Sequence, residues 1–223
     1  MLGIIFCAAV ATDRDCQLTI ARLKYGGGGD WYANPSAYPN LVKAIRERTD
    51  LPVCDTLATV EIMDEKLFRY PFVCMTGHGD VRLSARERVR LRAYLIGGGF
   101  LWADDSYGMD ASFRKEIAAL FPENALAELP PDHGIFHARY DLSALPKVHE
   151  HDGKPAQGFG VYFENRLMLF YSFSSDITDG MEDLNVHNDG EKIHELALRM
   201  GINLVTWFFE PKEKGQGSGG RNQ

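Results

Sequence analysis

The stretch that decides the fold is residues 70–108, which reads YPFVCMTGHGDVRLSARERVRLRAYLIGGGFLWADDSYG. Residues 70–76 and 100–104 are short apolar runs that end in polar turns, as is typical of strands buried in a parallel sheet. Between them, Ser84 and Glu87 have the spacing of a capping box, and three glycines follow the expected helix. Strand, turn, helix and strand in this order predict a parallel βαβ unit.

The same alternation continues on both sides of this unit. The further elements that we expect are strands at residues 18–25, 55–60, 158–164 and 166–173, helices at 34–49, 111–120 and 191–200, a weaker strand and loop at 136–144, a polar loop at 174–189, and a strand or helix at 201–209. The two strands on either side of Asn165 are expected to form a hairpin near the sheet edge. The pattern predicts an α/β fold with a doubly wound, mostly parallel sheet.

The chain has 223 residues, enough for one sizeable core, and we assign residues 18–210 to a single α/β domain. Residues 1–17 are expected to be a signal or a disordered N-terminus. Their apolar run, residues 2–11, is too short to span a bilayer and resembles the apolar part of a secretory signal, although no Lys or Arg precedes it. We therefore expect a periplasmic or exported protein, or a cytoplasmic one if the run is a truncated start or a buried strand. The Gly-rich residues 211–223 predict a disordered tail.

Charge and cysteine usage exclude several classes of protein. The formal net charge is −7, and no basic stripe with interleaved aromatic residues is present, so we expect no nucleic-acid partner. No segment reaches membrane-spanning length. The cysteines form no C-x-x-C pair, and we expect Cys54 and Cys74 to be small buried hydrophobes rather than parts of a disulfide framework.

Polar residues follow three of the predicted strands, at residues 26–31, 76–80 and 104–108. In a parallel sheet these turns meet at the carboxyl ends of the strands, where ligands bind. The loops at 149–153 and 174–187 are expected to join them. The residues that we expect to bind a ligand there are Gly28, Asp30, Trp31, Tyr32, Tyr107 and Asp176.

Histidines and aspartates in these turns indicate a possible divalent metal. His149 and His151 form an H-x-H pair, which on a strand places both rings on one face, and Asp152 and Asp104 add carboxylates. Such donors suit zinc, manganese or iron, although no dedicated spacing such as H-E-x-x-H occurs. The alternative is that these residues cap helices and brace loops. For the acidic residues of the 174–189 loop we favour a solvated or loop-bracing role.

Long motifs resemble a known family. The strings RLKYGGGGDWYANP, PFVCMTGHGD, GGGFLWADDSYG, KVHEHDGKP and FYSFSSDITDGMED are similar to the bacterial family catalogued as domain of unknown function 4159, over residues 18–209. That family is grouped with class I glutamine-amidotransferase-like domains. The resemblance implies a flavodoxin-like fold of that superfamily, and it implies no reaction because fold alone does not license function.

The amidotransferase analogy is tested by the strand-to-helix turn that would carry a nucleophilic cysteine. Here Ser106 stands at that place, preceded by Asp104 and Asp105, whose charges oppose formation of a thiolate or alkoxide. We therefore expect no glutaminase. A serine hydrolase using Ser106 and Asp105 with His78 or His151 stays open, beside the plainer interpretation that Ser106 caps the next helix.

Two classes of function remain. The first, which we favour, is a non-catalytic domain that binds a small ligand, a glycan or a protein partner at the carboxyl edge of the sheet. The alternative is a hydrolase that uses either a His/Asp metal site or Ser106 as nucleophile.

Overall fold

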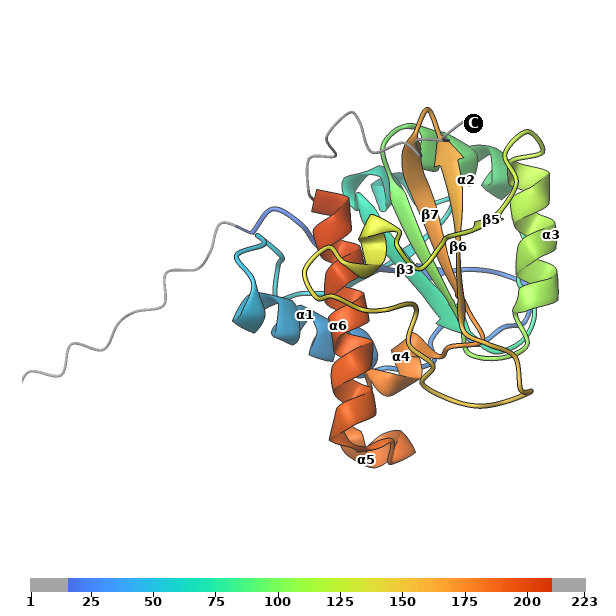
Figure 1. The fold of residues 1–223 in the computed structure, drawn as a ribbon. Helices are drawn as coiled ribbons and strands as arrows, with labels where there is room; N and C mark the ends of the chain where they lie inside the picture. The colour runs from blue at the N-terminus through green and yellow to red at the C-terminus, as the bar shows by residue number, and fades with distance from the viewer. Residues whose placement is uncertain (1–15, 210–223) are drawn as a thin grey trace, which may run out of the picture.

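A computed structural model describes residues 16–209, which form a seven-stranded mixed sheet with helices on both faces (Figure 1). The α/β architecture and the mostly parallel sheet are as predicted. The expected signal and the expected tail at residues 211–223 lie outside the described residues, apart from residues 16 and 17. Within residues 16–209, no helix is long and apolar enough to cross a membrane.

The strands are arranged in the order β2-β1-β3-β4-β7-β6-β5. Their bounds are β1 Ala21–Lys24, β2 Ala58–Glu61, β3 Phe72–Gly77, β4 Phe100–Asp105, β5 Ala127–Glu128, β6 Gln157–Phe163 and β7 Arg166–Phe173. Strands β1, β2, β3, β4 and β7 are parallel, so their carboxyl ends share one edge. The predicted hairpin is β6 and β7, but β7 pairs with β4 and so lies inside the sheet.

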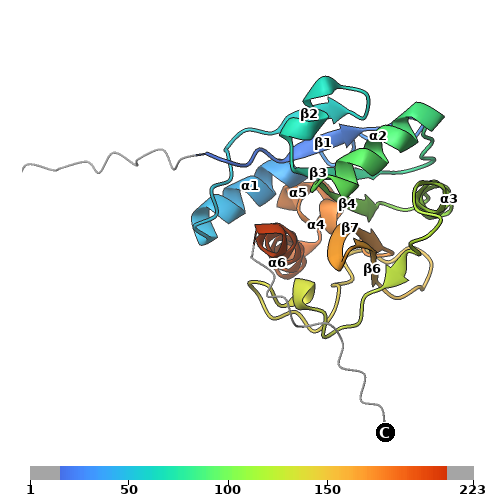
Figure 2. The same cartoon turned by 90° about the horizontal axis from the view of Figure 1, so that it is seen from above.

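Helices cover both faces of the sheet (Figure 2). They are α1 Ala37–Arg48, α2 Ala85–Ile96, α3 Asp110–Leu120, α4 Ile177–Gly180, α5 Leu184–His187 and α6 Gly190–Phe209, with 3₁₀ turns η1 Glu65–Arg69 and η2 Gly134–Phe136. Helices α1 and α6 lie on one face, and α2 and α3 lie on the other (Figure 2).

The sheet has a hydrophobic core on each of its two faces, because successive side chains of a strand point to opposite faces. Phe72 and Cys74 of β3 pack into the cluster that contains α1 and α6, whereas Val73 and Met75 pack into the cluster that contains α2 and α3. Burial of each large apolar side chain contributes about 1.5–3 kcal/mol. Both faces of the central strands are therefore apolar, which is why their sequences read as continuous hydrophobic runs.

The capping box that the sequence predicts at the start of α2 is present. The Ser84 hydroxyl accepts a hydrogen bond from the Glu87 amide at 3.3 Å, and the Ser84 amide donates to the Glu87 carboxylate at 2.7 Å. After the helix, a Cβ at Gly99 would clash with the ring of Tyr94. The predicted helix end therefore needs glycine at that position.

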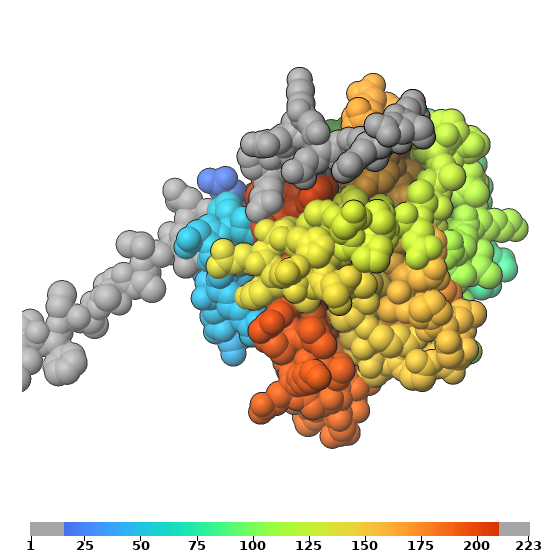
Figure 3. All heavy atoms as spheres, viewed as in Figure 1, coloured from blue at the N-terminus to red at the C-terminus, as the bar shows by residue number. Residues whose placement is uncertain are grey.

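The segment after η2 forms no strand, contrary to the weaker prediction for residues 136–144. A buried side chain, Asn203, takes the place of a sheet ladder there: its oxygen accepts from the amides of Arg139 and Tyr140, at 3.0 and 2.8 Å. Its amide nitrogen donates to the carbonyls of Phe136 and Tyr140. Asn203 belongs to α6, which runs through to Phe209, and the yellow segment that it holds covers the front of the molecule (Figure 3).

Residues 174–189 are also more ordered than predicted. Instead of one polar loop they contain the short helices α4 and α5, and the side chains of Asp176 and Asp179 are buried. The expectation of a solvated role is therefore wrong for Asp176, Asp179 and Glu182, whereas Asp183 is exposed as expected. The loop-bracing interpretation is the better one, because Glu182 accepts hydrogen bonds from the amide and hydroxyl of Ser36 at 2.9 and 3.0 Å.

A disulfide joins Cys16 to Cys54, which corrects the prediction that Cys54 is a free buried hydrophobe. Spacing in the sequence does not reveal the pair, because the two residues are 38 positions apart and meet only through the fold. The amide of Cys54 donates to the carbonyl of Leu18 at 2.8 Å, and this contact brings the two segments together. Cys74 is free and buried, as predicted.

The disulfide should stabilise the folded protein by restricting the unfolded chain. A closed loop of this length corresponds to about 3–4 kcal/mol in the chain-entropy account. We expect reductant to lower the free energy of unfolding of the wild type, measured with urea, by up to that amount. Reductant should leave the free energy of unfolding of the Cys16→Ala variant unchanged, because this variant lacks the Cys16–Cys54 bond. An equal effect on both proteins would contradict this role.

Candidate functional site

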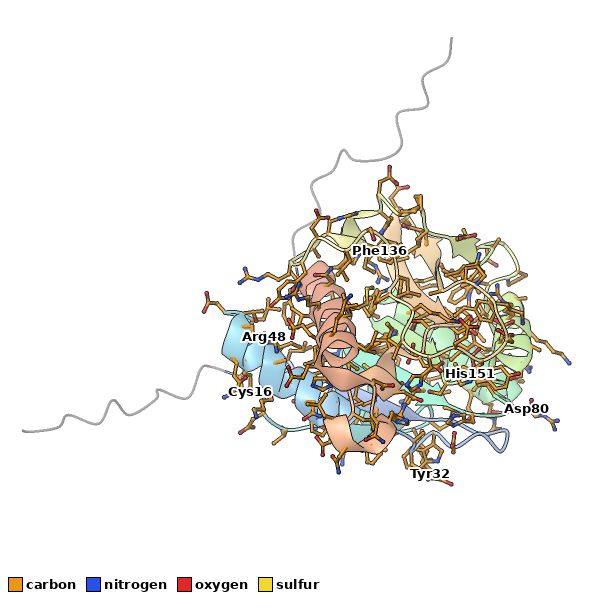
Figure 4. The ribbon with its side chains drawn as sticks, turned by 60° about the horizontal axis from the view of Figure 1, so that its bottom comes forward. Cys16, Tyr32, Arg48, Asp80, Phe136 and His151 are labelled. Atoms are coloured by element: carbon orange, nitrogen blue, oxygen red, sulfur yellow. A yellow bond between two sulfur atoms is a disulfide. The ribbon has the colours of Figure 1, made fainter. Side chains whose placement is uncertain are left out.

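The carboxyl ends of β1, β3, β4 and β7 gather the polar residues that the sequence singled out. In Figure 4 this end faces the viewer, and it carries the labelled residues Tyr32, Asp80 and His151. The loops after these strands meet the 149–153 loop and helices α4 and α5 there. The predicted convergence of these segments on one edge is therefore present.

The floor of the site is the buried carboxyl group of Asp104, at the end of β4. It accepts hydrogen bonds from the amide and the hydroxyl of Thr178, both at 2.7 Å, and from the hydroxyl of Ser172. Burial raises the pKa of Asp104 to about 7, although these hydrogen bonds oppose the rise. Asp104 thus anchors the start of α4 to the central strand.

A network of hydroxyl and amide groups covers this floor. Ser106 is fully buried, and its hydroxyl lies 2.8 Å from that of Thr76 and 3.4 Å from both the Asn34 amide nitrogen and an Asp179 oxygen. Asn34 also donates to Thr178 and Asp179, at 2.8 and 2.5 Å. No histidine is among the hydrogen-bond partners of Ser106 within residues 16–209, so the geometry does not support it as a base-activated nucleophile.

Above the floor, histidines and aspartates alternate in a chain. The order is His151, Asp176, His149, Asp179 and His187. His151 hydrogen-bonds Asp176 through Nε2. His149 Nδ1 lies 3.6 Å from Asp176 Oδ2 and 3.4 Å from Asp179 Oδ2, and His187 Nε2 lies 4.0 Å from Asp179 Oδ2.

Two overlapping groups of this chain have donor atoms close enough to share an ion. One is His149, His151 and Asp176, and the other is His149, Asp179 and His187; within each, the donor atoms lie within 4.8 Å of one another. His149 belongs to both. The two groups therefore describe one compact centre that is built on a single imidazole.

A carboxylate on the side of the ring opposite Asp176 and Asp179 fixes the orientation of His149. Its Nε2 lies 2.6 Å from Asp189 Oδ1, at the distance of a strong hydrogen bond. A histidine that donates one ring N–H to a carboxylate presents its other nitrogen as a metal ligand, with its tautomer and ring orientation set. Here that other nitrogen, Nδ1, faces Asp176 and Asp179.

Asp176 has an oxygen with nothing to bind. Its side chain is fully buried, and Oδ1 has no hydrogen-bond partner in the part of the chain that the structure describes. A buried carboxylate oxygen left in this state costs about 1–3 kcal/mol or more. The backbone of Asp176 is also left-handed, with φ of 61°, an uncommon conformation for a residue other than glycine. Both features call for a functional explanation.

Histidine and aspartate side chains of the centre shift one another's pKa values. The carboxylates of Asp176 and Asp179, which lie close to Nδ1, raise the pKa of His149 to about 10. Burial would raise the pKa of Asp179, but its interactions with His149, His187 and Asn34 together outweigh burial and lower that pKa. The two carboxylates therefore stabilise a positive charge at the position of the His149 ring.

The rim of the site is made by two turns that touch. Tyr107, in the turn between β4 and α3, has a left-handed φ of 79°, is exposed, and stacks on His151 with ring centroids 4.6 Å apart. The strained position of this turn is thus filled by Tyr107 and not by Ser106. A Cβ at the next residue, Gly108, would lie 3.6 Å from the amide of Gly79. The loop after β3 therefore adjoins the turn that carries Tyr107.

That loop after β3 carries a second His–Asp pair. His78 Nδ1 lies 3.1 Å from Asp30 Oδ2, and the His78 amide donates to Asp30 Oδ1. The glycine run after β1 packs against the same loop: a Cβ at Gly27 would lie 2.5 Å from the backbone nitrogen of Arg82. The glycines thus let two loops approach, and they place Asp30 against His78.

The remaining predicted site residues lie outside the His–Asp centre. Asp152 pairs with Lys154 at 2.7 Å in the 149–153 loop. Asp105 accepts a hydrogen bond from the Met109 amide at 3.0 Å, so Asp105 and not Ser106 braces the start of α3. Gly28 is exposed, and a Cβ there would meet nothing within 4 Å. Trp31 and Tyr32 lie in the loop between β1 and α1.

Sequence reasoning missed three members of the centre: Asp179, His187 and Asp189. All three lie in the stretch that we expected to be a polar loop. Their density of acidic residues and histidine was the available signal, but only the short helices bring them to His149. Asn34, which joins the β1–α1 loop to Asp179, carried no signal of its own.

The raised pKa of Asp104 predicts the sign of a pH effect on stability. Its folded pKa of about 7 exceeds the ordinary pKa of 3.8, so the folded state holds this proton more tightly than the unfolded chain does. The protonated carboxyl group therefore adds to the free energy of unfolding below pH 4, and this stabilisation is lost as pH rises through 7. Each tenfold difference in proton affinity between the folded and unfolded states corresponds to about 1.4 kcal/mol. Urea unfolding should show the wild type losing a few kcal/mol relative to Asp104→Asn between pH 4 and 8; a gain would contradict the assignment.

The comparisons with known proteins identify a family without a described activity. The sequence profile described as Domain of unknown function (DUF4159) matches residues 19–209, which is most of the chain and contains every residue of the His–Asp centre. No curated protein matches the chain. The resemblance drawn from the sequence motifs is therefore confirmed at the level of the family, and the chain belongs to the family Domain of unknown function (DUF4159).

Proposed function

We propose that this protein is a metal-dependent hydrolase whose ion is bound by His149, His151 and Asp176 at the carboxyl edge of the sheet. The observation that carries the proposal is the buried carboxylate of Asp176: Oδ1 lacks a partner among the described residues, and Oδ2 faces two imidazoles. Two histidines and one carboxylate, with further positions left for water, are the ligand set of many catalytic zinc sites and of non-haem iron sites.

The spacing of the donor atoms supports this proposal. Zinc binds nitrogen and oxygen at about 2.0–2.1 Å, so two ligands of a tetrahedral ion lie roughly 3.3 Å apart. The distances from His149 Nδ1 to Asp176 and Asp179, 3.6 and 3.4 Å, are close to this separation. His151 Nε2 instead hydrogen-bonds Asp176 directly and would exchange that bond for the ion. Asp179 and His187 would complete the coordination or hold the ion from its other side.

The donor set also favours some ions over others. Imidazole nitrogen is a ligand for zinc, iron, nickel and copper, whereas calcium and magnesium prefer oxygen. A centre with three imidazoles among its five donors therefore suits a transition ion. Of the zinc, manganese and iron that the sequence indicated, we therefore infer zinc or iron.

The rim provides groups for proton transfer. A bound ion would lower the pKa of its water and so supply a nucleophile. His78 is oriented by Asp30 through Nδ1, which leaves Nε2 directed elsewhere, as in a histidine that acts as a general base. Tyr107, exposed beside His151, would contact the substrate. We assign the proton transfer to His78 and the substrate contact to Tyr107.

A second candidate is the non-catalytic binding function that the sequence favoured, in which the ion holds a ligand without turnover. The hollow beside the centre, lined by residues that include Asp179, His187 and His194, is narrow. A hollow this small does not enclose an organic substrate, which favours binding at the ion without turnover.

Two finer inferences accompany the proposal. The strand order β2-β1-β3-β4, continued by β7 as the fifth parallel strand, supports a flavodoxin-like fold and with it the amidotransferase-like superfamily. The disulfide between Cys16 and Cys54 supports an exported protein, because such bonds persist in oxidising compartments.

Metal content tests the proposal most simply. We expect about one equivalent of a transition ion in protein purified without a tag, measured by mass spectrometry. His151→Ala and Asp176→Asn should each lower the content at least tenfold, because each removes a ligand. His137→Ala is the matched control, since His137 also pairs with an aspartate, Asp141, outside the centre.

Turnover separates the two candidates. Wild-type protein loaded with zinc is assayed on chromogenic esters, phosphodiesters and amides. The hydrolase predicts turnover that His78→Ala lowers about 100-fold while the metal content stays at the wild-type value. A bound ion without turnover supports the binding function. Absence of any ion in the wild type, or equal content in His151→Ala, overturns both.

A further inference from the structure

A second binding surface lies on the β1–β2 side of the carboxyl edge. It is an open groove of about 510 Å³, lined by Lys24, Trp31, Thr59, Glu61, Met63 and Asp64. None of these residues belongs to the His–Asp centre. The volume falls within the range of about 300–1,000 Å³ that is usual for small-molecule sites.

The sheet register builds one wall of this groove. Lys24 of β1 is the register partner of Glu61 of β2, and Lys24 Nζ lies 2.6 Å from Glu61 Oε1. Thr59, two residues before Glu61, points to the same side of the strand. An ammonium group, a carboxylate and a hydroxyl thus stand in a row along the edge of the sheet, and the side chains of Lys24 and Glu61 are about half exposed.

An indole ring forms another part of the groove. Trp31 is half-buried, and Lys24 Nζ lies over the face of its ring, 5.6 Å from the centroid, so a sugar that stacked on this face would displace the ammonium group. Tyr32 packs edge-on against Trp31, with centroids 5.6 Å apart and an interplanar angle of 89°, which holds the indole in place. Tyr32 and Met63 are exposed on either side. The groove therefore has a fixed aromatic surface bordered by donors and acceptors of hydrogen bonds.

We propose that this groove is a saccharide-binding site for a neutral or amino sugar. A pyranose has an apolar C–H face, which suits an aromatic ring, and a rim of hydroxyls that both donate and accept hydrogen bonds. Trp31 provides the ring, Glu61 and Asp64 accept, and Lys24 donates. An aromatic ring with one wet edge is the side chain usually found where a ligand is partly apolar and partly polar.

Charge narrows the class of sugar. The groove contains two carboxylates and one ammonium group, so its formal charge is −1. An acidic sugar, such as a uronic acid, would bring a further negative charge beside Glu61 and Asp64 and is disfavoured. Because the groove is open, binding should be weak, in the millimolar range.

The test uses saturation-transfer NMR with full-length protein and three probes: cellotriose, chitosan trimer and a trigalacturonic acid. Chelator is present throughout, so that the result is independent of the proposed metal centre. We expect the neutral or the amino trimer to bind at about 1 mM, and trigalacturonic acid to bind at least tenfold more weakly. Trp31→Ala should weaken binding at least tenfold, and Glu61→Gln severalfold.

Two controls keep this test decisive. Phe68→Ala removes an exposed aromatic ring outside the groove and should leave the affinity unchanged. Trp31→Phe retains an aromatic ring and should keep most of the affinity, so its behaviour distinguishes stacking from a loss of folding in Trp31→Ala. Absence of binding by both non-acidic probes, or equal affinity of wild type and Trp31→Ala, overturns the proposal. Loss of binding in Phe68→Ala to the same extent would also overturn it.

Discussion

The constraint on which the site depends is the burial of three carboxylates, Asp104, Asp176 and Asp179, at one edge of the sheet. Buried charges that are not compensated are costly, so each must have partners. Asp104 has hydroxyl and amide donors and a raised pKa, and Asp179 has Asn34 and His149. Asp176 is the exception, because one of its oxygens lacks a partner among the described residues. Its other oxygen, Oδ2, faces His149 and His151, and a bound cation would take this carboxylate and both imidazoles as ligands.

The fold places these groups through one short helix, α4. Thr178, in its first turn, binds Asp104 at the end of β4, while Asp176 and Asp179 on either side of it reach His149. Asn34 joins the loop after β1 to the same helix. The centre is therefore assembled from the ends of β1, β4 and β7 and from the 149–153 loop, as expected for a site at the carboxyl edge of a parallel sheet. A rigid sheet with polar loops at one end is a usual setting for chemistry.

The sequence predicted the central part of the fold because burial on both faces leaves a clear signal. The apolar runs of β3 and β4 and the capping box at Ser84 are local patterns, and they are present. His149 and His151 were also named, as metal ligands, and Asp176 was named as a ligand-binding residue. The burial of Asp179, the contact of His187 and the disulfide between Cys16 and Cys54 depend on contacts between distant segments. Composition had indicated a solvated loop there, and tertiary packing outweighed it.

The most direct test of the account is X-ray absorption spectroscopy on protein loaded with one equivalent of zinc. The account predicts nitrogen and oxygen neighbours at about 2.0–2.1 Å, with the outer-shell scattering of at least two imidazoles, one of which disappears in His151→Ala. A shell of oxygen alone, without imidazole scattering, or a spectrum that His151→Ala leaves unchanged, would show that the ion is not held by the His–Asp centre and would contradict the central claim.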